Sequence, residues 1–445
     1  MAESGKSNKM GVVELTIITV VNMLGAGIIM LPTKLAKVGT MSILSWVVTA
    51  GGSLALAYAF AVCGRFSKKG GGMGGYAEYA FGRSGNFLAN FTYAVSLVIA
   101  NVAIALSAVG YFAVLLGIDL TATLSAALTI GLIWITTVAN FGGAKITGRI
   151  GSFTVWGVII PVLTVSVIGW FFFSPTMYTE AWNPHNMPFG EAISASIPMT
   201  LWAFLGLESA CANSDAVENP EKNVPIAVLG GTTLTAIIYI VSTNVMAGIV
   251  PNLELAESTA PFGLVFAKMF SPAIGQAVMA AMVVACVGCL LGWQFTVAQV
   301  FKSGADEGYF SKVFAKVTAK DAPITGMLIL AVVQTVLAFM TMGDELAEQF
   351  SAIVDLAAVT NLVPFVLSMA AVAAMQRAEN APKSQMAMNT FVALIGNIYS
   401  FYALYSCGMV AMYWGGMATF LGWVIYGKIK ADEMDAGIAK ASDEA

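Results

Sequence analysis

Long apolar segments alternate with short polar loops along the chain, and this pattern predicts an all-α polytopic membrane protein. Each of twelve segments is apolar over about 20 residues, the length that a helix needs to cross a bilayer. The most uniform of them, Phe153–Phe173, carries no charged residue. The twelve predicted transmembrane helices cover roughly residues 12–36, 41–63, 86–116, 121–141, 151–174, 190–212, 225–250, 274–301, 324–342, 350–376, 386–408 and 410–428.

Composition supports this prediction and narrows the function classes. Of the 445 residues, 58% are hydrophobic and 10% are charged, whereas soluble domains carry about 25% charged residues. The expected surrounding is therefore the lipid bilayer. The sequence has no basic patch and no recognition motif for nucleic acid, so we expect no nucleic-acid partner.

The basic residues of the loops predict the orientation. With twelve helices both termini lie on one side of the membrane, and that side carries all of the 21 Lys and Arg residues except Lys34, Lys37 and Lys268. Loops rich in Lys and Arg are typically cytoplasmic. We therefore expect both termini to be cytoplasmic.

Two segments contain helix-breaking residues. Segment 1 has Gly25-Ala26-Gly27 in its middle, and segment 6 has Gly206 two residues before Glu208. The two lie five segments apart, and discontinuous helices at corresponding positions of two halves are typical of inverted-repeat transporters. The single domain 1–445 then divides into repeat one at about 12–174, repeat two at about 190–376, helices 11 and 12 at about 386–428 and a cytoplasmic tail at 429–445.

Glu208 is the first candidate for chemistry. A carboxylate at membrane depth costs roughly 2.5–3.5 kcal/mol on insertion scales and usually faces a cavity. Unwound backbone at that depth is tolerated only where protein or a water-filled cavity covers it. The stretch around Gly206 and Glu208 therefore predicts a solute site. The alternative is a mobile helix end with a glutamate near the surface.

Aromatic and amide side chains extend this candidate site. Trp202 and Trp293 lie well inside their segments, and a tryptophan ring face binds organic ammonium ions. Two such faces with a carboxylate between them suit a small dication, while core packing is the alternative for each ring. Tyr93 and Asn101 share one helical face of segment 3, for which interhelical packing is the alternative.

We expect neither a cofactor nor a metal. The loop GGGMGGY contains the spacing G-x-G-x-x-G, but a predicted transmembrane helix precedes it, whereas a dinucleotide site needs a strand there. Cys286 and Cys289 have no second Cys pair to complete a zinc motif. The single histidine, His185, lies in a loop.

Long blocks of the chain resemble one family. VVNMLGAGIIMLPTKLA, GGMGGYAEYAFGRSGNF, LWAFLGLESACANSD and LGWQFTVAQVFKSGADEGYF are similar to blocks in polyamine-transporting members of the basic amino acid and polyamine antiporter family, within the amino acid–polyamine–organocation superfamily. The similarity runs from about Lys6 to Tyr426. It implies a twelve-helix inverted-repeat fold in the cell inner membrane and a transporter rather than an enzyme.

The resemblance also implies substrates. It implies that putrescine is exchanged for ornithine or taken up with protons, by alternating access. The alternatives are a lysine–cadaverine or arginine–agmatine exchanger and, more remotely, a non-transporting sensor or channel on the same fold. A homodimer is left open.

Residues at matching positions take roles from the resemblance. Trp202 and Trp293 match aromatic residues that enclose and gate the substrate, Glu208 matches an acid that binds the substrate amine and couples transport, and Tyr93 and Asn101 match pocket positions. The helix 1 break, which receives α-amino and carboxylate groups, includes Met23, Gly25, Ala26 and Gly27. Further positions associated with transport are Cys63, Glu78, Lys302, Tyr309, Trp423 and Tyr426.

The chain departs from the family pattern at two positions. Ala26 stands where the family usually has a serine, so a hydroxyl donor near the substrate carboxylate is lost. Phe365 stands where relatives often have tyrosine. Both changes affect the amino-acid half of the exchange more than the diamine half.

Overall fold

The computed structural model describes residues 11–208, 217–318, 322–340, 342 and 346–443, and this part of the chain is helical, with no strand. Within it, nine helices are long and apolar enough to cross a membrane, and α1 (Val12–Met23) and α15 (Ile324–Met340) are shorter apolar helices. Every predicted segment contains at least part of one helix among its described residues. Positions 209–212 and 341 of those segments lie outside the description.

The other elements, in chain order, are η1 (Ala26–Ile28), α2 (Leu31–Val38), η2 (Thr40–Ser42), α3 (Ile43–Phe66), α4 (Met73–Leu116), α5 (Ala122–Ala139), η3 (Asn140–Gly142), α6 (Ala144–Thr154), α7 (Trp156–Ile168), η4 (Gly169–Phe172), α8 (Pro175–Glu180), α9 (Phe189–Phe204), α11 (Pro220–Ala247), α12 (Asn252–Glu257), α13 (Pro261–Met269), α14 (Pro272–Asp306), α16 (Leu346–Ala378), α17 (Lys383–Ser406) and α18 (Gly408–Asp443).

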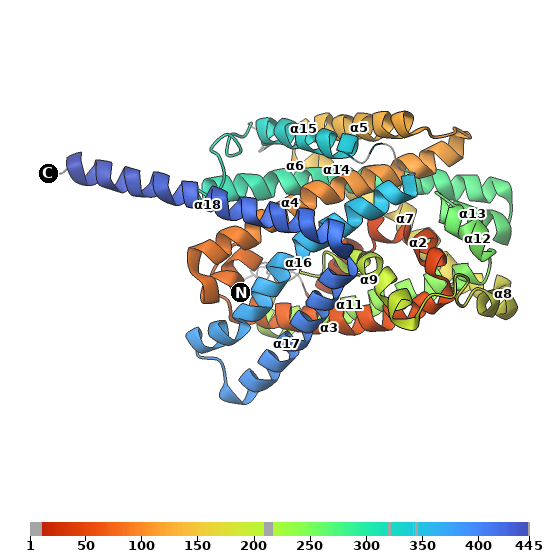
Figure 1. Cartoon of the computed structure of the whole chain (residues 1–445), viewed down its shortest axis with the longest axis horizontal. Helices are drawn as coiled ribbons and strands as arrows, with labels where there is room; N and C mark the ends of the chain where they lie inside the picture. The colour runs from red at the N-terminus through yellow and green to blue at the C-terminus, as the bar shows by residue number, and fades with distance from the viewer. Residues whose placement is uncertain (1–10, 209–216, 319–321, 341, 343–345, 444–445) are drawn as a thin grey trace, which may run out of the picture.

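The long helices α4 and α11 make the packing contacts that position the functional site. α4 packs along α16 and α14, and α11 packs against both α1 and α3. α18 runs over α4 and α16 and then extends beyond the other helices toward the C-terminus (Figure 1). α4 is not one straight rod, because Gly82 inside it has a φ of 63° and kinks its first two turns away from the rest.

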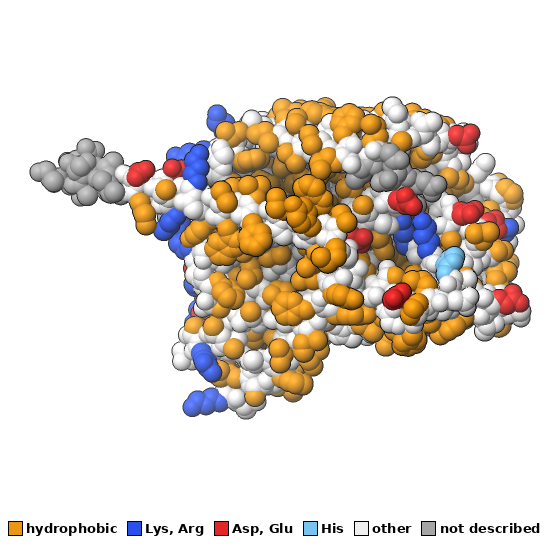
Figure 2. Space-filling model, in the orientation of Figure 1, with side chains coloured by type: hydrophobic (Ala, Val, Ile, Leu, Met, Phe, Trp, Pro, Cys, Tyr) orange, Lys and Arg blue, Asp and Glu red, His pale blue; other side chains and the backbone are white. Residues whose placement is uncertain are grey.

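Large apolar side chains occupy both the interior and the outer surface. Trp46, Phe60 and Tyr239 are fully buried, whereas Phe153, Phe171 and Met409 are largely exposed. A soluble protein rarely exposes so much contiguous apolar surface. Figure 2 shows this apolar surface, with Lys and Arg gathered mainly at the end from which α18 extends. The surface therefore fits a lipid surrounding between two polar ends.

Candidate functional site

α9 ends where the sequence predicts a break. Its last helical residue is Phe204, Leu205 is extended, and Gly206 has a φ of +112°, a conformation that L side chains rarely adopt. A Cβ atom at Gly206 would lie 3.1 Å from the carbonyl oxygen of Asn22. Glycine is thus required here both by the backbone turn and by the close approach of α1. Residues 209–216, which include Cys211, lie outside the described residues.

α1 ends opposite this turn. The helix stops at Met23, the 3-10 turn η1 begins at Ala26, and α2 begins at Leu31. A Cβ atom at Gly27 would lie 3.2 Å from Cα of Ala203, so this break packs directly on the last turn of α9. Both helices therefore end beside each other, as the two predicted interruptions require.

Tyr239 of α11 joins the two helix ends. Its hydroxyl reaches the carbonyl oxygen of Met23 and, at 2.9 Å, that of Ala203. Its ring stacks on Trp46 with centroids 5.6 Å apart and meets Phe204 edge-on at 5.7 Å. The last carbonyls of a helix have no partner within the helix, so a buried hydroxyl that serves two helices stabilises both ends.

A cavity lies between these helix ends and helices α4, α14 and α16. It offers about 60 Å³ to the centres of water-sized groups, several times the about 10–15 Å³ that one water requires. Six of the nine predicted binding residues line it: Met23, Gly25, Gly27, Trp202, Glu208 and Trp293. The other described lining residues are Asn22, Ser96, Leu97, Ala100, Ile104, Leu205, Gly206, Cys289, Ala357 and Asn361.

Glu208 is the only ionisable side chain among these lining residues except for the thiol of Cys289. It is 6% exposed. Its carboxylate accepts hydrogen bonds from the backbone N–H of Gly206 at 3.0 Å and from the hydroxyl of Tyr93 at 3.3 Å. No ion pair to Glu208 occurs among the described residues. The cavity therefore has an acid held by neutral donors.

The two tryptophans approach the cavity from different helices. Trp202 lies in the last turn of α9 and is 7% exposed, and its indole N–H has no acceptor among the described residues. Trp293 lies in the middle of α14 and is half-buried. Both rings thus border the same space as Glu208.

The residues predicted to share one face of α4 have two different surroundings in the structure. Leu97 and Ile104 line the cavity and Tyr93 reaches Glu208. Asn101 does not belong to the described lining: it is fully buried and its amide donates to Oε1 of Gln294 at 3.3 Å. This is the interhelical packing that stood as the alternative for Asn101.

Sequence reasoning missed the polar residues that α4 and α16 contribute. Asn361 of α16 lines the cavity, and its amide donates to the hydroxyl of Ser96 at 3.0 Å, while its own Oδ1 has no partner among the described residues. An asparagine in the middle of an apolar helix is itself a signal, since polar groups there face the interior of a bundle. Tyr239 carries no comparable sequence signal.

The helix 1 break also includes Ala26, whose backbone opens η1. Nothing in the described structure bears on its side chain. The loss of a serine hydroxyl at this position therefore remains a statement about sequence.

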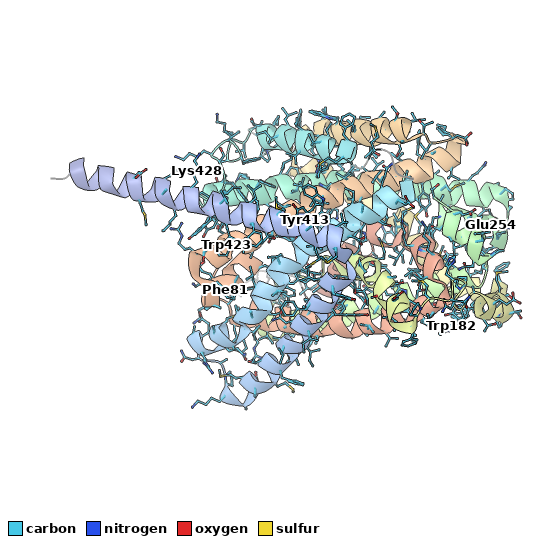
Figure 3. The ribbon with its side chains drawn as sticks, viewed as in Figure 1. Phe81, Trp182, Glu254, Tyr413, Trp423 and Lys428 are labelled. Carbon is cyan, nitrogen blue, oxygen red and sulfur yellow. The ribbon has the colours of Figure 1, made fainter. Side chains whose placement is uncertain are left out.

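The six further residues that the resemblance associates with transport are not among the described residues that line this cavity. Cys63 is buried in α3. Tyr309 and Tyr426 both contact the ring of Phe87, with centroids 5.8 Å and 5.2 Å away. Trp423 on α18 is 44% exposed (Figure 3). Lys302 pairs with Asp306 at 3.2 Å.

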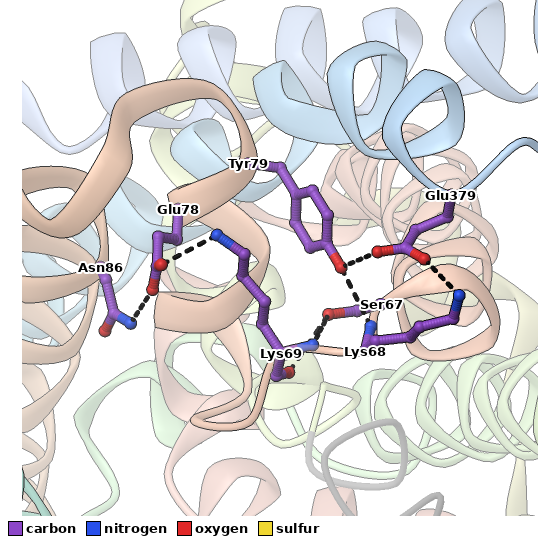
Figure 4. Close-up of polar contacts among 7 residues, drawn as sticks. All are labelled: Ser67, Lys68, Lys69, Glu78, Tyr79, Asn86 and Glu379. Atoms are coloured by element: carbon purple, nitrogen blue, oxygen red, sulfur yellow. Dashed lines mark hydrogen bonds and ion pairs between the residues drawn. The ribbon is translucent and has the colours of Figure 1, made fainter.

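Glu78 belongs to a polar network that fastens the loop between α3 and α4 (Figure 4). Its carboxylate binds Lys69 at 2.8 Å and accepts from the amide of Asn86 at 2.7 Å. In the same loop Lys68 pairs with Glu379 at 2.8 Å, an acid that also accepts from the hydroxyl of Tyr79.

Hydrogen bonding within that second pair shifts both pKa values. The hydrogen bond to Lys68, with that from Tyr79, lowers the pKa of Glu379, and the hydrogen bond to Glu379 raises the pKa of Lys68. Both groups are therefore ionised at neutral pH. The pair ties the loop after α3 to the end of α16.

The sequence of this chain matches a known protein family and several known proteins. A family model described as amino acid permease matches residues 10–427. The chain is 65% identical over 424 residues to the "Putrescine transporter PotE" of Escherichia coli strain K12, which covers 95% of this chain and 97% of that protein. It is 64% identical to the protein of the same name from Haemophilus influenzae. The "Cadaverine/lysine antiporter" of Escherichia coli K12 is 30% identical over 369 residues, 81% of this chain and 82% of that protein.

Tyr239→Phe is expected to loosen the junction of α1 and α9. The substitution keeps the ring and removes only the hydroxyl, so the carbonyls of Met23 and Ala203 lose a buried donor, at a cost of about 1–3 kcal/mol. We expect a lower midpoint of thermal unfolding in detergent, measured by size-exclusion chromatography after heating. Tyr413→Phe removes the same atom from a ring that is 61% exposed and should leave the midpoint unchanged. Equal midpoints for both variants would contradict the bridging role.

Proposed function

This chain belongs to the amino acid permease family, and we propose that it transports putrescine across a membrane. The observation that carries the proposal is the 65% identity to a putrescine transporter over 95% of the chain, together with a buried carboxylate that lines the cavity at the helix breaks. The chain is a transporter and not an enzyme. The 30% identity to a cadaverine/lysine antiporter ranks that exchanger second.

The charge distribution of the cavity supports a cationic substrate. α1 and α9 both present their C-terminal ends to it, and the carbonyls at a helix C-terminus together act as about half a negative charge. Glu208 adds a full charge. No Lys or Arg is among the described lining residues, so no cationic side chain there balances the charge of Glu208. An ammonium group is therefore stabilised at this point.

The tryptophans support an alkyl diamine in particular. A ring face of Trp202 or Trp293 attracts an ammonium ion by about 0.5–2 kcal/mol, and the same rings with Leu97 and Ile104 cover a methylene chain. We assign Tyr93 to positioning the Glu208 carboxylate. Asn101 is assigned to the walls behind the cavity.

We further propose exchange with ornithine and coupling to protons. Ornithine carries a carboxylate that putrescine lacks, and the break at Met23, Gly25, Ala26 and Gly27 is the place where backbone N–H groups can meet it. Glu208 is the group proposed to bind either a proton or a diamine ammonium.

The proposed topology is twelve transmembrane helices in two inverted repeats of five, with helices 1 and 6 discontinuous and both termini cytoplasmic in the cell inner membrane. α1 with α2 forms helix 1, and α9 forms the first half of helix 6. The repeats cover about 12–174 and 190–376, and helices 11 and 12 cover about 386–428. The concentration of Lys and Arg at the end from which α18 extends supports this orientation (Figure 2).

The proposed mechanism is alternating access around the cavity. Cys63, Glu78, Lys302, Tyr309, Trp423 and Tyr426 are proposed to act on movement between states. Along α4, Glu78 comes before the kink at Gly82, and Phe87, whose ring contacts Tyr309, comes after it. Both are therefore placed to control the angle of that kink.

Counterflow separates the candidate substrates. Purified protein in liposomes is loaded with unlabelled ornithine, lysine or arginine, or with buffer, and given labelled putrescine outside. We expect uptake to be fastest with internal ornithine. Faster uptake with internal lysine, combined with cadaverine outcompeting putrescine, would move the chain to the second candidate function.

Glu208→Gln is expected to weaken putrescine binding strongly. The change keeps the size of the side chain, removes its charge and replaces one acceptor oxygen with an amide donor. A hydrogen bond to a charged group is worth about 1.5–3 kcal/mol, or about tenfold to a hundredfold in affinity. The measurement is the half-saturating putrescine concentration in proteoliposomes at matched protein density. Wild-type kinetics in this variant would remove Glu208 from the site.

Replacements of Trp293 test the ring face. Trp293→Phe retains a weaker π face, whereas Trp293→Leu retains only bulk, so we expect the leucine variant to lose about threefold to thirtyfold in affinity and the phenylalanine variant less. Both are compared by putrescine uptake in the same liposomes. If the two variants lose affinity equally, shape or the indole N–H is the property that matters.

A further inference from the structure

A second cavity adjoins the first at Glu208. It lies between the loop after α3, the first half of α4 and the end of α14, and it offers about 220 Å³ to the centres of water-sized groups. Gly71, Tyr76, Asn90 and Glu307 line it together with Tyr93 and Glu208. Glu208 lines both cavities, so the two cavities meet at this carboxylate.

The outer cavity has a second carboxylate. Glu307 directly follows α14, and its Oε1 faces the glycine loop: a Cβ atom at Gly71 would lie 4.0 Å from this oxygen and 3.9 Å from Nδ2 of Asn90. The two carboxylates, one buried and one at the outer part, thus border one continuous space.

Glu307 differs from the other carboxylates around it. Glu78 is paired with Lys69, Asp306 with Lys302, and Glu379 with Lys68, and two of these pairs are visible in Figure 4. Among the described residues the side chain of Glu307 has neither an ion pair nor a hydrogen bond. Partial desolvation and the negative charge of Glu78 raise the pKa of Glu307. A cation bound beside Glu307 would stabilise its ionised carboxylate and so offset both effects.

We propose that Glu307, in the cavity wall that also includes Asn90 and Tyr76, forms an outer subsite for one ammonium group of an alkyl diamine. A diamine has a positive group at each end, so carboxylates at two positions along one cavity match it better than a monoamine. The proposal rests on the proposed function, because it assigns a station on the route to Glu208. The outer subsite is the part of this cavity away from Glu208, and it lies on the side of the membrane proposed to be cytoplasmic.

Sidedness provides the test. Putrescine transport is measured in inside-out and right-side-out membrane vesicles that contain wild type, Glu307→Gln, Glu307→Asp or Asp432→Asn. Asp432 is the matched control, an exposed acid on α18 that lines neither cavity. An exposed charge pair is worth about 0.2–1 kcal/mol, so the loss of Glu307 should raise the half-saturating concentration by up to about fivefold.

We expect that rise in inside-out vesicles only, with an unchanged maximal rate. Glu307→Asp and Asp432→Asn should behave as wild type, and high salt should reduce the difference because it screens exposed charges. An unchanged Glu307→Gln, an equal rise in both vesicle types, or a rise in Asp432→Asn as well would overturn the subsite. If wild type itself does not transport putrescine, the proposed function fails. If wild type transports putrescine and one of the contradicting outcomes above is found, only the subsite fails.

Discussion

The arrangement of the site depends on how the ends of α1 and α9 are held beside each other. Interrupting a helix within a bilayer leaves backbone groups without partners, and each such group is costly unless protein or a water-filled cavity provides one. Here the hydroxyl of Tyr239 reaches the carbonyls of Met23 and Ala203, and Gly27 and Gly206 let the two backbones approach. Trp46 and Phe204 hold the Tyr239 ring in place. This junction therefore provides hydrogen-bond partners at both helix ends and stabilises the side of the cavity that these ends form.

The same junction determines the sign of charge that the cavity accepts. Two helix C-termini and Glu208 all bring negative charge to one place, and the Glu208 carboxylate accepts hydrogen bonds from neutral donors, the hydroxyl of Tyr93 and the backbone N–H of Gly206. The remaining lining is largely apolar or aromatic. A cation with an aliphatic chain satisfies both features, and this explains why the cavity geometry and the similarity to putrescine transporters point to the same substrate class.

The residues proposed to control access lie outside the described lining of the cavity that contains this chemistry. The network around Glu78 and the aromatic contacts of Phe87 lie on either side of Gly82, where α4 bends. Beyond the bend, α4 continues to Tyr93, Leu97 and Ile104 beside the cavity. The loop network and the cavity are therefore linked along α4, with the bend at Gly82 between them, and the proposed gating would act through this helix.

The sequence by itself determined the helical class, the location of the apolar segments and both interruptions, because these depend on local composition: about 20 apolar residues for a span, and glycine where a helix must stop. It also identified Glu208 and both tryptophans, since a charge or a large amphipathic ring inside an apolar segment is conspicuous. Tertiary structure alone decided which side chains meet. Asn101 and Leu97 lie on the same helical face, yet one packs on Gln294 and the other lines the cavity. Tyr239 and Asn361 come from distant helices. The partners of Tyr239 are two backbone carbonyls and that of Asn361 is a serine hydroxyl, and no local pattern marks any of them. Local sequence encodes where a helix breaks, but the partner of each exposed polar group depends on how distant helices pack.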